Sequence, residues 1–256
     1  MTTIITLVVL VSLGIVLVEA DGNDCIIRDN DPIENCCNLG FSYSKFSSVV
    51  NKPKVYDVKN FCGNCQSTLT KVYCDTLTAG GGWTVIQRRQ DGSVDFFNRG
   101  WVEYEEGFGD LTGEFWYGLH SIHCLTSIGR WELRIDINFT NGTQSYLSYK
   151  QFSVASSENQ YQLSISGYDG VALTDPFMYD RNHILNNMKF TTNDRDNDLH
   201  SRSNCAAYHG PWWHRACSVV RPHFVYGSKY TMYINHQWHH LPFMEMKIRP
   251  LNCYRS

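Results

Sequence analysis

Three aspartates alternate with other residues in a short stretch of the second half of the chain: Asp194, Asp196 and Asp198. Like charges held this close repel one another, so a fold that keeps them together needs a compensating partner. A hard cation is the usual partner, because hard cations take oxygen ligands. An EF-hand would need Gly and Glu where Leu199 and Cys205 stand, so we expect a calcium loop of another kind. The alternative is a solvated acidic turn, since Asp and Asn also favour turns.

An aromatic-rich segment between two cysteines follows directly. A bridge between Cys205 and Cys217 would close a loop that contains Tyr208, His209, Trp212, Trp213 and His214. Aromatic side chains on such a closed loop beside a cation would make a rigid recognition surface at low entropic cost. The alternative is that the two tryptophans belong to the core.

Alternating strands are expected to position these loops. The run from Trp131 to Ile137 places apolar side chains on one face and Glu132, Arg134 and Asp136 on the other, which predicts a half-buried antiparallel strand. The same alternation after Met244 predicts a strand that returns to the sheet. Further strands are predicted within 55–75, at 83–88, 146–152 and 161–165, with turns at 90–92 and 141–142.

The rest of the chain divides into an aromatic segment and a loop-rich region. The aromatics between 96 and 108 are predicted to be core, with Trp101, Tyr104 and Phe108 on one helical face. Turn residues dominate between 168 and 241. We expect this region to be held by calcium and a disulfide rather than by a large core, and to carry the function.

The first twenty residues resemble a secretion signal. An almost unbroken apolar run from Ile4 to Val18 is followed by Glu19-Ala20, a small-residue cleavage pattern. We therefore expect residues 1–20 to be removed and the mature chain to be secreted and extracellular. No later apolar run approaches the length of a membrane span, so no transmembrane segment is expected.

Charge and cysteine content narrow the function classes. The chain has 256 residues and a net charge of −3 without a basic cluster, which argues against nucleic-acid binding. Ten cysteines in a secreted chain indicate disulfides rather than zinc ligands. The Cys62-Gly-Asn-Cys65 pair is interpreted as structural, because no βαβ pattern accompanies it.

Two adjacent sequons, Asn138-Phe-Thr and Asn141-Gly-Thr, predict a glycoprotein with this turn on its surface. Residues 21–54 are predicted to form a short cysteine-containing segment. They contain no collagen triplets and no heptads, so this segment provides no oligomerising stalk.

Several short motifs together resemble a fibrinogen C-terminal (fibrinogen-related) domain over most of the chain. They are Gly81 to Phe96, Gly107-Phe-Gly, Gly113 to Gly118, Ile122-His, Asp194 to Asp198, Asn204-Cys-Ala, Trp212-Trp213 and Met246 to Pro250. The resemblance implies an α+β fold over 55–253, with a twisted antiparallel sheet, short helices and a loop-rich calcium-binding C-terminal subdomain. Relatives of the ficolin, tachylectin, angiopoietin and tenascin type are binding modules rather than enzymes.

The resemblance also assigns a metal site and disulfides. The implied calcium ligands are the carboxylates of Asp196 and Asp198 and backbone carbonyls near His200 and Arg202. Cys205 is implied to pair with Cys217. Cys74 is implied to pair with Cys36 or Cys37, which leaves Cys62, Cys65, Cys124 and Cys253 as additions.

Lectin-type relatives bind acetyl groups in a pocket beside the calcium. The positions that match this pocket are Tyr208, His209, Ala216, Cys217, Ser218 and Tyr230. The resemblance implies a cis peptide between Ala216 and Cys217, which costs a few kcal/mol outside proline. The loop between the cysteines is one residue short and Ser218 stands where the family often has His, so these departures fall on the pocket itself.

Three functions follow as hypotheses. The first is a secreted, calcium-dependent, lectin-like recognition protein for carbohydrate or acetylated ligands, with a role in innate immunity. The second is a protein-binding signalling ligand or extracellular-matrix glycoprotein of the angiopoietin or tenascin type, which the altered loop favours. The third is a zinc enzyme that uses His236, His239 and His240, but Pro242 and the missing HExxH motif argue against it, and we expect no enzymatic activity.

A homo-oligomer would have to form through the domain surface or the additional cysteines.

Overall fold

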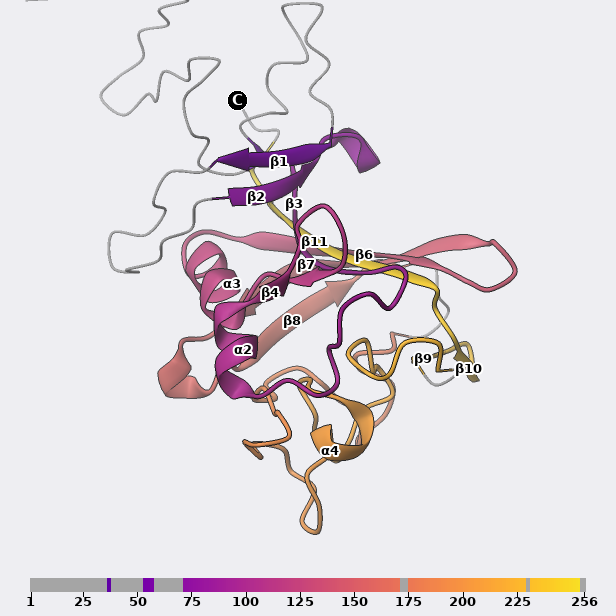
Figure 1. Cartoon of the computed structure of the whole chain (residues 1–256). Coiled ribbons are helices and arrows are strands. Elements are labelled where there is room, and N and C mark those ends of the chain that lie inside the picture. The colour runs from indigo at the N-terminus through magenta and orange to yellow at the C-terminus, as the bar shows by residue number, and fades with distance from the viewer. Residues whose placement is uncertain (1–35, 38–52, 58–70, 171–174, 229–230, 254–256) are drawn as a thin grey trace, which may run out of the picture.

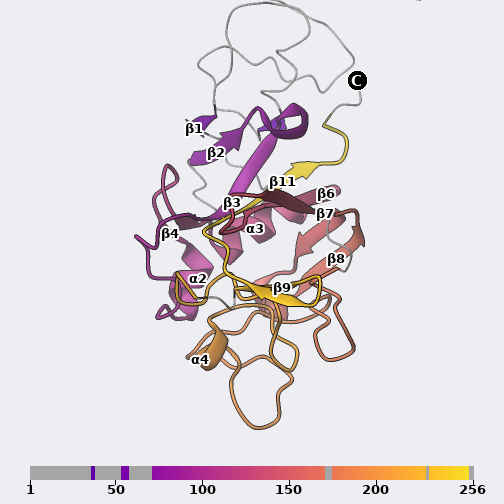
Figure 2. The ribbon, with the colours of Figure 1, turned by 90° about the vertical axis from the view of Figure 1, so that its right-hand side faces the viewer.

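The computed structural model describes residues 36–37, 53–57, 71–170, 175–228 and 231–253. The predicted signal at 1–20, most of the segment 21–54, and Cys25, Cys62, Cys65 and Tyr230 lie outside these ranges, and the signal and segment boundaries stay predictions. A sheet crosses the middle of the molecule, and the loops of the C-terminal half gather at the end opposite β1 and β2 (Figures 1 and 2). The predicted α+β class is confirmed.

The central sheet is antiparallel throughout and has the strand order β1-β2-β3-β11-β6-β7-β8. These strands are β1 (Lys54–Asp57), β2 (Lys71–Asp75), β3 (Trp83–Arg89), β11 (Phe243–Pro250), β6 (Trp131–Asn138), β7 (Gln144–Val154) and β8 (Leu163–Tyr168). Two short strands, β4 (Phe108–Gly109) and β5 (Phe115–Trp116), pair with each other, and β5 pairs with β3. The last strand of the chain therefore lies at the centre of the sheet, as its alternation predicts.

The two faces of the sheet differ as the sequence predicts. Ile135 and Met246 are register partners on the apolar face and are fully buried. On the other face, Lys247 is also buried because its ammonium group contacts three carboxylates: Asp75 at 2.6 Å, Asp136 at 2.7 Å and Glu245 at 2.8 Å. An unpaired buried charge would be strongly destabilising, so this face depends on the complete set of ion pairs.

Three short helices of the described residues accompany the sheet: α2 (Trp101–Glu106), α3 (Leu119–Thr126) and α4 (Ala206–His209). Single 3-10 turns, η2 (Thr78–Gly80) and η3 (Ser157–Asn159), occur in loops. Helix α3 packs on β7, and α2 packs on α3. Trp101 and Tyr104 are buried in the core, as predicted, whereas Phe108 lies beyond the helix in β4. Among the described residues, no helix is long and apolar enough to cross a membrane.

The loop-rich region after β8 corrects one expectation. It contains only α4 and a small hairpin of β9 (Met232–Ile234) and β10 (Gln237–His239) among the described residues, so the loop-rich character is confirmed. However, it does not lack a core. Trp213 packs edge-on against Phe190 at 5.1 Å and against Trp116 of β5 at 6.2 Å, and these rings are buried. Aromatic side chains from the loops therefore complete the core of the sheet and hold the loops in place.

Three disulfides are resolved among the described cysteines: Cys36–Cys74, Cys37–Cys253 and Cys205–Cys217. The expected partner of Cys74 is thus Cys36. Cys253 and Cys124, expected as additions to the family pattern, are both disulfide-bonded, and the partner of Cys253 is Cys37. The Cys37–Cys253 bond joins residues 216 positions apart and ties the end of β11 to the N-terminal part of the domain.

Candidate functional site

The side chains of the three alternating aspartates do not form a single site. The carboxylate of Asp194 accepts a hydrogen bond from the backbone N–H of Trp101 at 2.9 Å, and therefore caps the N-terminus of α2. It also accepts a hydrogen bond from the Thr192 hydroxyl at 2.7 Å. A Cβ at Gly100 would come within 2.8 Å of the same carboxylate, so glycine allows this close approach. Asp194 therefore joins the loop to the helix, and it was not among the expected metal ligands.

Asp196 and Asp198 form a separate pair in the turn that leads to the disulfide loop. The Asp198 N–H donates to Asp196 Oδ1 at 3.2 Å. Asp198 Oδ1 accepts from the His200 N–H at 2.7 Å, and Asp198 Oδ2 accepts from the Cys205 N–H at 2.7 Å. Each Asp198 oxygen thus accepts one backbone hydrogen bond, and a carboxylate has about four lone-pair sites in all.

The electrostatics of this pair suit a cation. Burial raises the pKa of Asp198; the hydrogen bonds from Cys205 and His200 lower it, and the charge of Asp196 raises it again, so that the net shift is upward. The ionised state of Asp198 is therefore less favourable than in water. A hard cation beside the two carboxylates would remove this penalty.

The expected carbonyl ligands lie where the chain turns toward the disulfide. His200 is half-buried and Arg202 is exposed. Within the described ranges, neither carbonyl accepts a backbone hydrogen bond from a turn or loop. The residues present therefore fit a calcium ion with two carboxylates, two carbonyls and water, and the ion itself stays a prediction.

The Cys205–Cys217 loop is joined to the aspartate pair at both of its ends. The Cys205 N–H donates to Asp198, and the Leu199 N–H donates to the Arg215 carbonyl at 2.6 Å. The structure brings five expected pocket residues to this loop, Tyr208, His209, Ala216, Cys217 and Ser218, whereas Tyr230 lies outside the described residues.

Two details of the expected pocket differ in the structure. The Ala216–Cys217 peptide is trans, so the expected cis bond is wrong; Cys217 instead adopts a left-handed conformation with φ of 65°. Ser218 is buried, and its hydroxyl accepts a hydrogen bond from the Val220 N–H at 2.9 Å.

The aromatic residues of the loop are divided between core and surface. Trp212 and Trp213 are fully buried, so the expectation that they form part of a recognition surface is wrong and the alternative, that they belong to the core, is confirmed. Tyr208 is 63% exposed, and His209 beside it is half-buried. Tyr208 is therefore the exposed aromatic side chain of the loop, and Leu199, which precedes the loop and bonds the Arg215 carbonyl through its N–H, is 59% exposed.

Three histidines near the loop are held in the neutral state. Burial lowers the pKa of His209 to about 4, with a further contribution from the charge of Arg221. Burial lowers the pKa of His214 to about 3 and that of His223 well below its ordinary value. Because neutral imidazole keeps one N–H, His214 can satisfy the Gly210 carbonyl at 2.8 Å without a charge.

The histidines considered for zinc are not arranged as ligands. His236 lies in the turn between β9 and β10, and His239 lies in β10. The helix that would place His236 and His240 on one face is therefore not formed. In the part of the chain that the structure describes, no three His, Cys, Asp or Glu side chains come together as metal ligands. A calcium site made of two carboxylates and backbone carbonyls does not need three such side chains.

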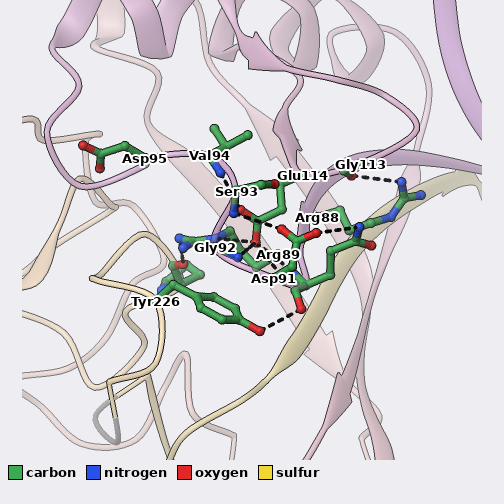
Figure 3. Close-up of polar contacts among 12 residues, drawn as sticks. Arg88, Arg89, Asp91, Gly92, Ser93, Val94, Asp95, Gly113, Glu114 and Tyr226 are labelled. Atoms are coloured by element: carbon green, nitrogen blue, oxygen red, sulfur yellow. Dashed lines mark hydrogen bonds and ion pairs between the residues drawn. The ribbon is translucent and has the colours of Figure 1, made fainter.

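A second carboxylate site, Glu114, was not singled out from the sequence. Glu114 is buried, and its Oε1 accepts backbone hydrogen bonds from Gln90 at 2.7 Å and from Asp91 and Gly92 at 3.1 Å (Figure 3). Its Oε2 accepts from the Val94 N–H at 3.0 Å. The segment 90–92 is therefore not a hairpin turn as predicted. Its backbone N–H groups instead surround the carboxylate of Glu114, which lies later in the sequence; we call this arrangement the Glu114 cradle. Gly92, at φ of 74°, permits this curvature.

Arginine 89 completes this cradle. Its Nε lies 3.4 Å from Glu114 Oε1, and its Nη1 donates to the Pro222 carbonyl at 3.0 Å. Tyr226 donates its hydroxyl hydrogen to the Gln90 carbonyl at 2.7 Å (Figure 3). Burial alone would raise the pKa of Glu114, but the backbone hydrogen bonds and Arg89 lower it below its ordinary value. The sequence around Glu114 shows only a charged residue beside apolar neighbours, and the backbone groups that bind it come from an earlier turn.

Comparison with known proteins agrees with this architecture. Residues 49–251 match the family of fibrinogen beta and gamma chains, C-terminal globular domain. The chain is 44% identical over 192 residues to Tenascin-R of Homo sapiens, which covers 71% of this chain and 13% of that protein. It is 45% identical over 197 residues to Fibrinogen C domain-containing protein 1 of Mus musculus, which covers 71% of this chain and 41% of that protein. The chain thus spans less than half the length of these curated relatives.

Solved structures show the same similarity. The fibrinogen-like globe domain of human ANGPTL6 matches with a TM-score of 0.73 and 31% identity, over 89% of this chain and 99% of that chain. A lamprey fibrin D-dimer, solved with the peptide Gly-His-Arg-Pro-amide, matches with a TM-score of 0.70 and 30% identity, over 89% and 76% of the two chains. Sequence and structure together establish that the chain belongs to the family of fibrinogen C-terminal globular domains.

Proposed function

We propose that this protein is an extracellular, calcium-binding recognition protein whose ligand binds at the Cys205–Cys217 loop. Three disulfides suit an oxidising, extracellular compartment. The family is one of binding domains, and the loop lies at the end of the molecule opposite β1 and β2 (Figure 1). This function is not enzymatic.

The observation that carries the proposal is the contact between the aspartate pair and the disulfide loop. Asp198 accepts the Cys205 N–H at 2.7 Å, so a single carboxylate touches both the expected ion site and the first residue of the loop. Asp196 and Asp198, with the carbonyls of His200 and Arg202, would hold the ion. A bound calcium ion supplies positive charge that offsets the repulsion between the two carboxylates.

Hydrogen bonds between the aspartate pair and the Cys205–Cys217 loop would then fix the conformation of the ligand-binding surface. Because the bound cation would balance its negative charge, the Asp198 carboxylate can stay deprotonated and keep its hydrogen bonds to the N–H groups of Cys205 and His200. The Leu199–Arg215 backbone bond holds the other half of the loop. Tyr208 and Leu199 would therefore be presented in one fixed arrangement, which reduces the entropy lost on binding.

The first ligand class is a carbohydrate or acetylated compound. Tyr208 offers an exposed ring beside His209, whose imidazole is half-buried and whose Nδ1 is buried. An exposed aromatic ring can pack against the apolar face of a sugar or against an acetyl methyl group. A single shallow site of this kind binds weakly, so a multivalent ligand is expected to bind best.

The test is binding of the secreted protein to immobilised N-acetylglucosamine and to glucose, in calcium and in chelator. Capture on the acetylated sugar in calcium alone is expected. Asp198→Ala should lose this capture and keep the central sheet, whereas Asp110→Ala, which removes a carboxylate from a distant exposed turn, should bind as the wild type does. Equal capture in chelator would contradict the proposed role of calcium.

A protein partner is the second candidate, and two observations favour it. The trans peptide and the buried Ser218 alter the expected acetyl pocket, while Leu199 and Tyr208 place apolar surface beside it. The lamprey relative was solved with a peptide ligand. If no acetylated sugar is captured but the chain still gains thermal stability from calcium, a protein ligand at the same loop becomes the better proposal.

A further inference from the structure

The polar face of the central sheet contains a groove far from the Cys205–Cys217 loop in sequence. Its volume is about 530 Å³, and side chains from β2, β6, β7 and β11 line it. The register of the strands orders these side chains into rows. Asn138 of β6 lies between Gln144 of β7 and Phe243 of β11, and Asp136 lies between Tyr146 and Glu245 in the next row.

The floor of this groove carries no net charge. Three carboxylates (Asp75, Asp136 and Glu245) are matched by three cations: Lys247 contacts all three, Arg134 contacts Asp136 at 2.7 Å, and Arg88 contacts Glu245 at 2.6 Å. Carboxylate oxygens have more lone pairs than these contacts use. The groove can therefore accept hydrogen bonds from hydroxyl and amide groups, and a neutral polar occupant would disturb the ion pairs least.

Aromatic rings border the same groove. The Arg134 guanidinium lies 3.9 Å from the centroid of the Tyr146 ring and covers one of its faces. Tyr146 and Phe243 are each partly exposed. A sugar combines hydroxyl and amide groups with an apolar ring face, so it matches the lining of this groove better than an ion or a purely apolar ligand does.

One lining residue is itself a sequon. Asn138 precedes Phe139-Thr140, is half-buried at the end of β6, and lines the groove. Two strand residues span about 7 Å, so the row of Asp136 and Tyr146 lies within reach of a sugar attached to Asn138.

The second sequon differs in its surroundings. Asn141 is exposed in the β6–β7 turn, where its side chain accepts the Thr143 N–H at 2.9 Å. A Cβ at neighbouring Gly142 would meet nothing within 4 Å, so this turn projects into open space.

We propose that Asn138 carries an N-linked glycan whose first N-acetylglucosamine lies in this groove. In forming it, the Asn138 amide nitrogen bonds to C1 of the sugar, and the bond from C1 to the phosphate of a lipid-diphosphate donor breaks. The diphosphate leaves with the electron pair, and one amide proton passes to a base of the transferase. The groove thus holds a resident sugar of the chain itself, independent of calcium and of the proposed ligand.

The test uses the full chain secreted from eukaryotic cells, with glycopeptide mass spectrometry and thermal unfolding. Thr140→Ala removes the Asn138 sequon but keeps the asparagine, and Thr143→Ala is the matched control for Asn141; both threonines are exposed. Asn138 is expected to be glycosylated. Thr140→Ala should lower Tm by about 2–4 °C, and Thr143→Ala should leave it within about 1 °C.

Two further measurements locate the sugar. Wild-type protein trimmed by an endoglycosidase to a single N-acetylglucosamine should keep its Tm, because only the first sugar is seated. In a double-mutant cycle, Tyr146→Ala should remove most of the Tm loss caused by Thr140→Ala. An unmodified Asn138, equal Tm values for the two threonine variants, or additive effects of Thr140→Ala and Tyr146→Ala would each overturn the proposal.

Discussion

Glu114 and Asp198 are both carboxylates that accept hydrogen bonds from a loop backbone, yet their surroundings differ. Glu114 accepts four backbone N–H groups and lies beside Arg89, and these contacts lower its pKa. Asp198 accepts two backbone N–H groups and lies beside Asp196, and its pKa is raised. The protein thus supplies all the positive charge that Glu114 needs, but leaves Asp198 with a like-charged neighbour.

This difference separates a structural carboxylate from a candidate ligand-binding one. A carboxylate that is already stabilised by the protein gains nothing from an added cation, whereas a carboxylate in excess of its partners does. The turn at Glu114 should therefore be stable in chelator. The conformation of the turn at Asp198 should depend on bound calcium.

The largest effect is expected for Glu114→Gln, which keeps the shape of the side chain but removes its charge. Four backbone N–H groups and Arg89 would lose a charged acceptor in a buried site, and such losses cost about 3–5 kcal/mol. Urea unfolding at pH 7.5 would measure this loss, and it should be the same in calcium and in chelator. Asp110→Asn, in an exposed turn, is the control; a loss below about 1 kcal/mol for Glu114→Gln would contradict the cradle model.

The second effect is acid destabilisation of the loop region through His214 and His223. Their folded-state pKa values lie below the ordinary value of 6.5, so the stability they contribute is full above pH 6.5 and is lost as pH falls toward the folded values. At pH 5.5 the loss is about 1.4 kcal/mol for each fully buried histidine, or about 3 kcal/mol for both. Glu114 remains ionised in this window because its pKa is lowered.

Hydrogen exchange at pH 7.5 and 5.5 would resolve the two regions. Amides of the loop region should lose protection at pH 5.5 before those of the Glu114 turn. His214→Gln, which keeps a donor for the Gly210 carbonyl, should reduce the acid loss of global stability by about 1.4 kcal/mol. Uniform loss of protection across both regions would contradict the assignment to the histidines.

The third effect is the stability gained from calcium. Extracellular calcium modules bind with dissociation constants of about 10⁻⁴–10⁻³ M, so a few millimolar calcium corresponds to about ten times Kd. The expected gain is about 1.4 kcal/mol, or about 3–5 °C in Tm. Asp198→Asn should abolish this gain, while Glu114→Gln should keep it despite its lower starting stability. A gain that survives in Asp198→Asn would place the ion elsewhere.

The strands were predictable from the sequence because each alternates between a core face and a polar face. Trp131 to Ile137 and Met244 to Ile248 show this directly, and register follows once one face is buried. The loop-rich region was predictable only as loops. Its core depends on Phe190 and Trp213 meeting Trp116 of a distant strand, and a local sequence window does not contain that contact.

The candidate site was predictable in composition but not in geometry. The spacing of Asp194, Asp196 and Asp198 suggested one cluster, yet the first of them caps a helix that begins 93 positions earlier. The cis peptide implied by family resemblance was wrong at Ala216–Cys217. Glu114 carries no local pattern of its own, because its four partners come from a turn about twenty residues earlier.

The smallest effect is expected for Asp194→Ala, and it separates the cap of α2 from the proposed ion site. Loss of the hydrogen bond to the Trp101 N–H should cost about 1 kcal/mol, the usual value for an N-cap. The calcium-dependent gain in Tm should nevertheless persist, because Asp194 contacts α2 and Thr192 rather than Asp196 or Asp198. Asp194→Asn, which can still accept one N–H, should recover most of the stability. If Asp194→Ala instead abolished the calcium response, the three aspartates would act as one site, and the division between a capping carboxylate and a binding pair would be wrong.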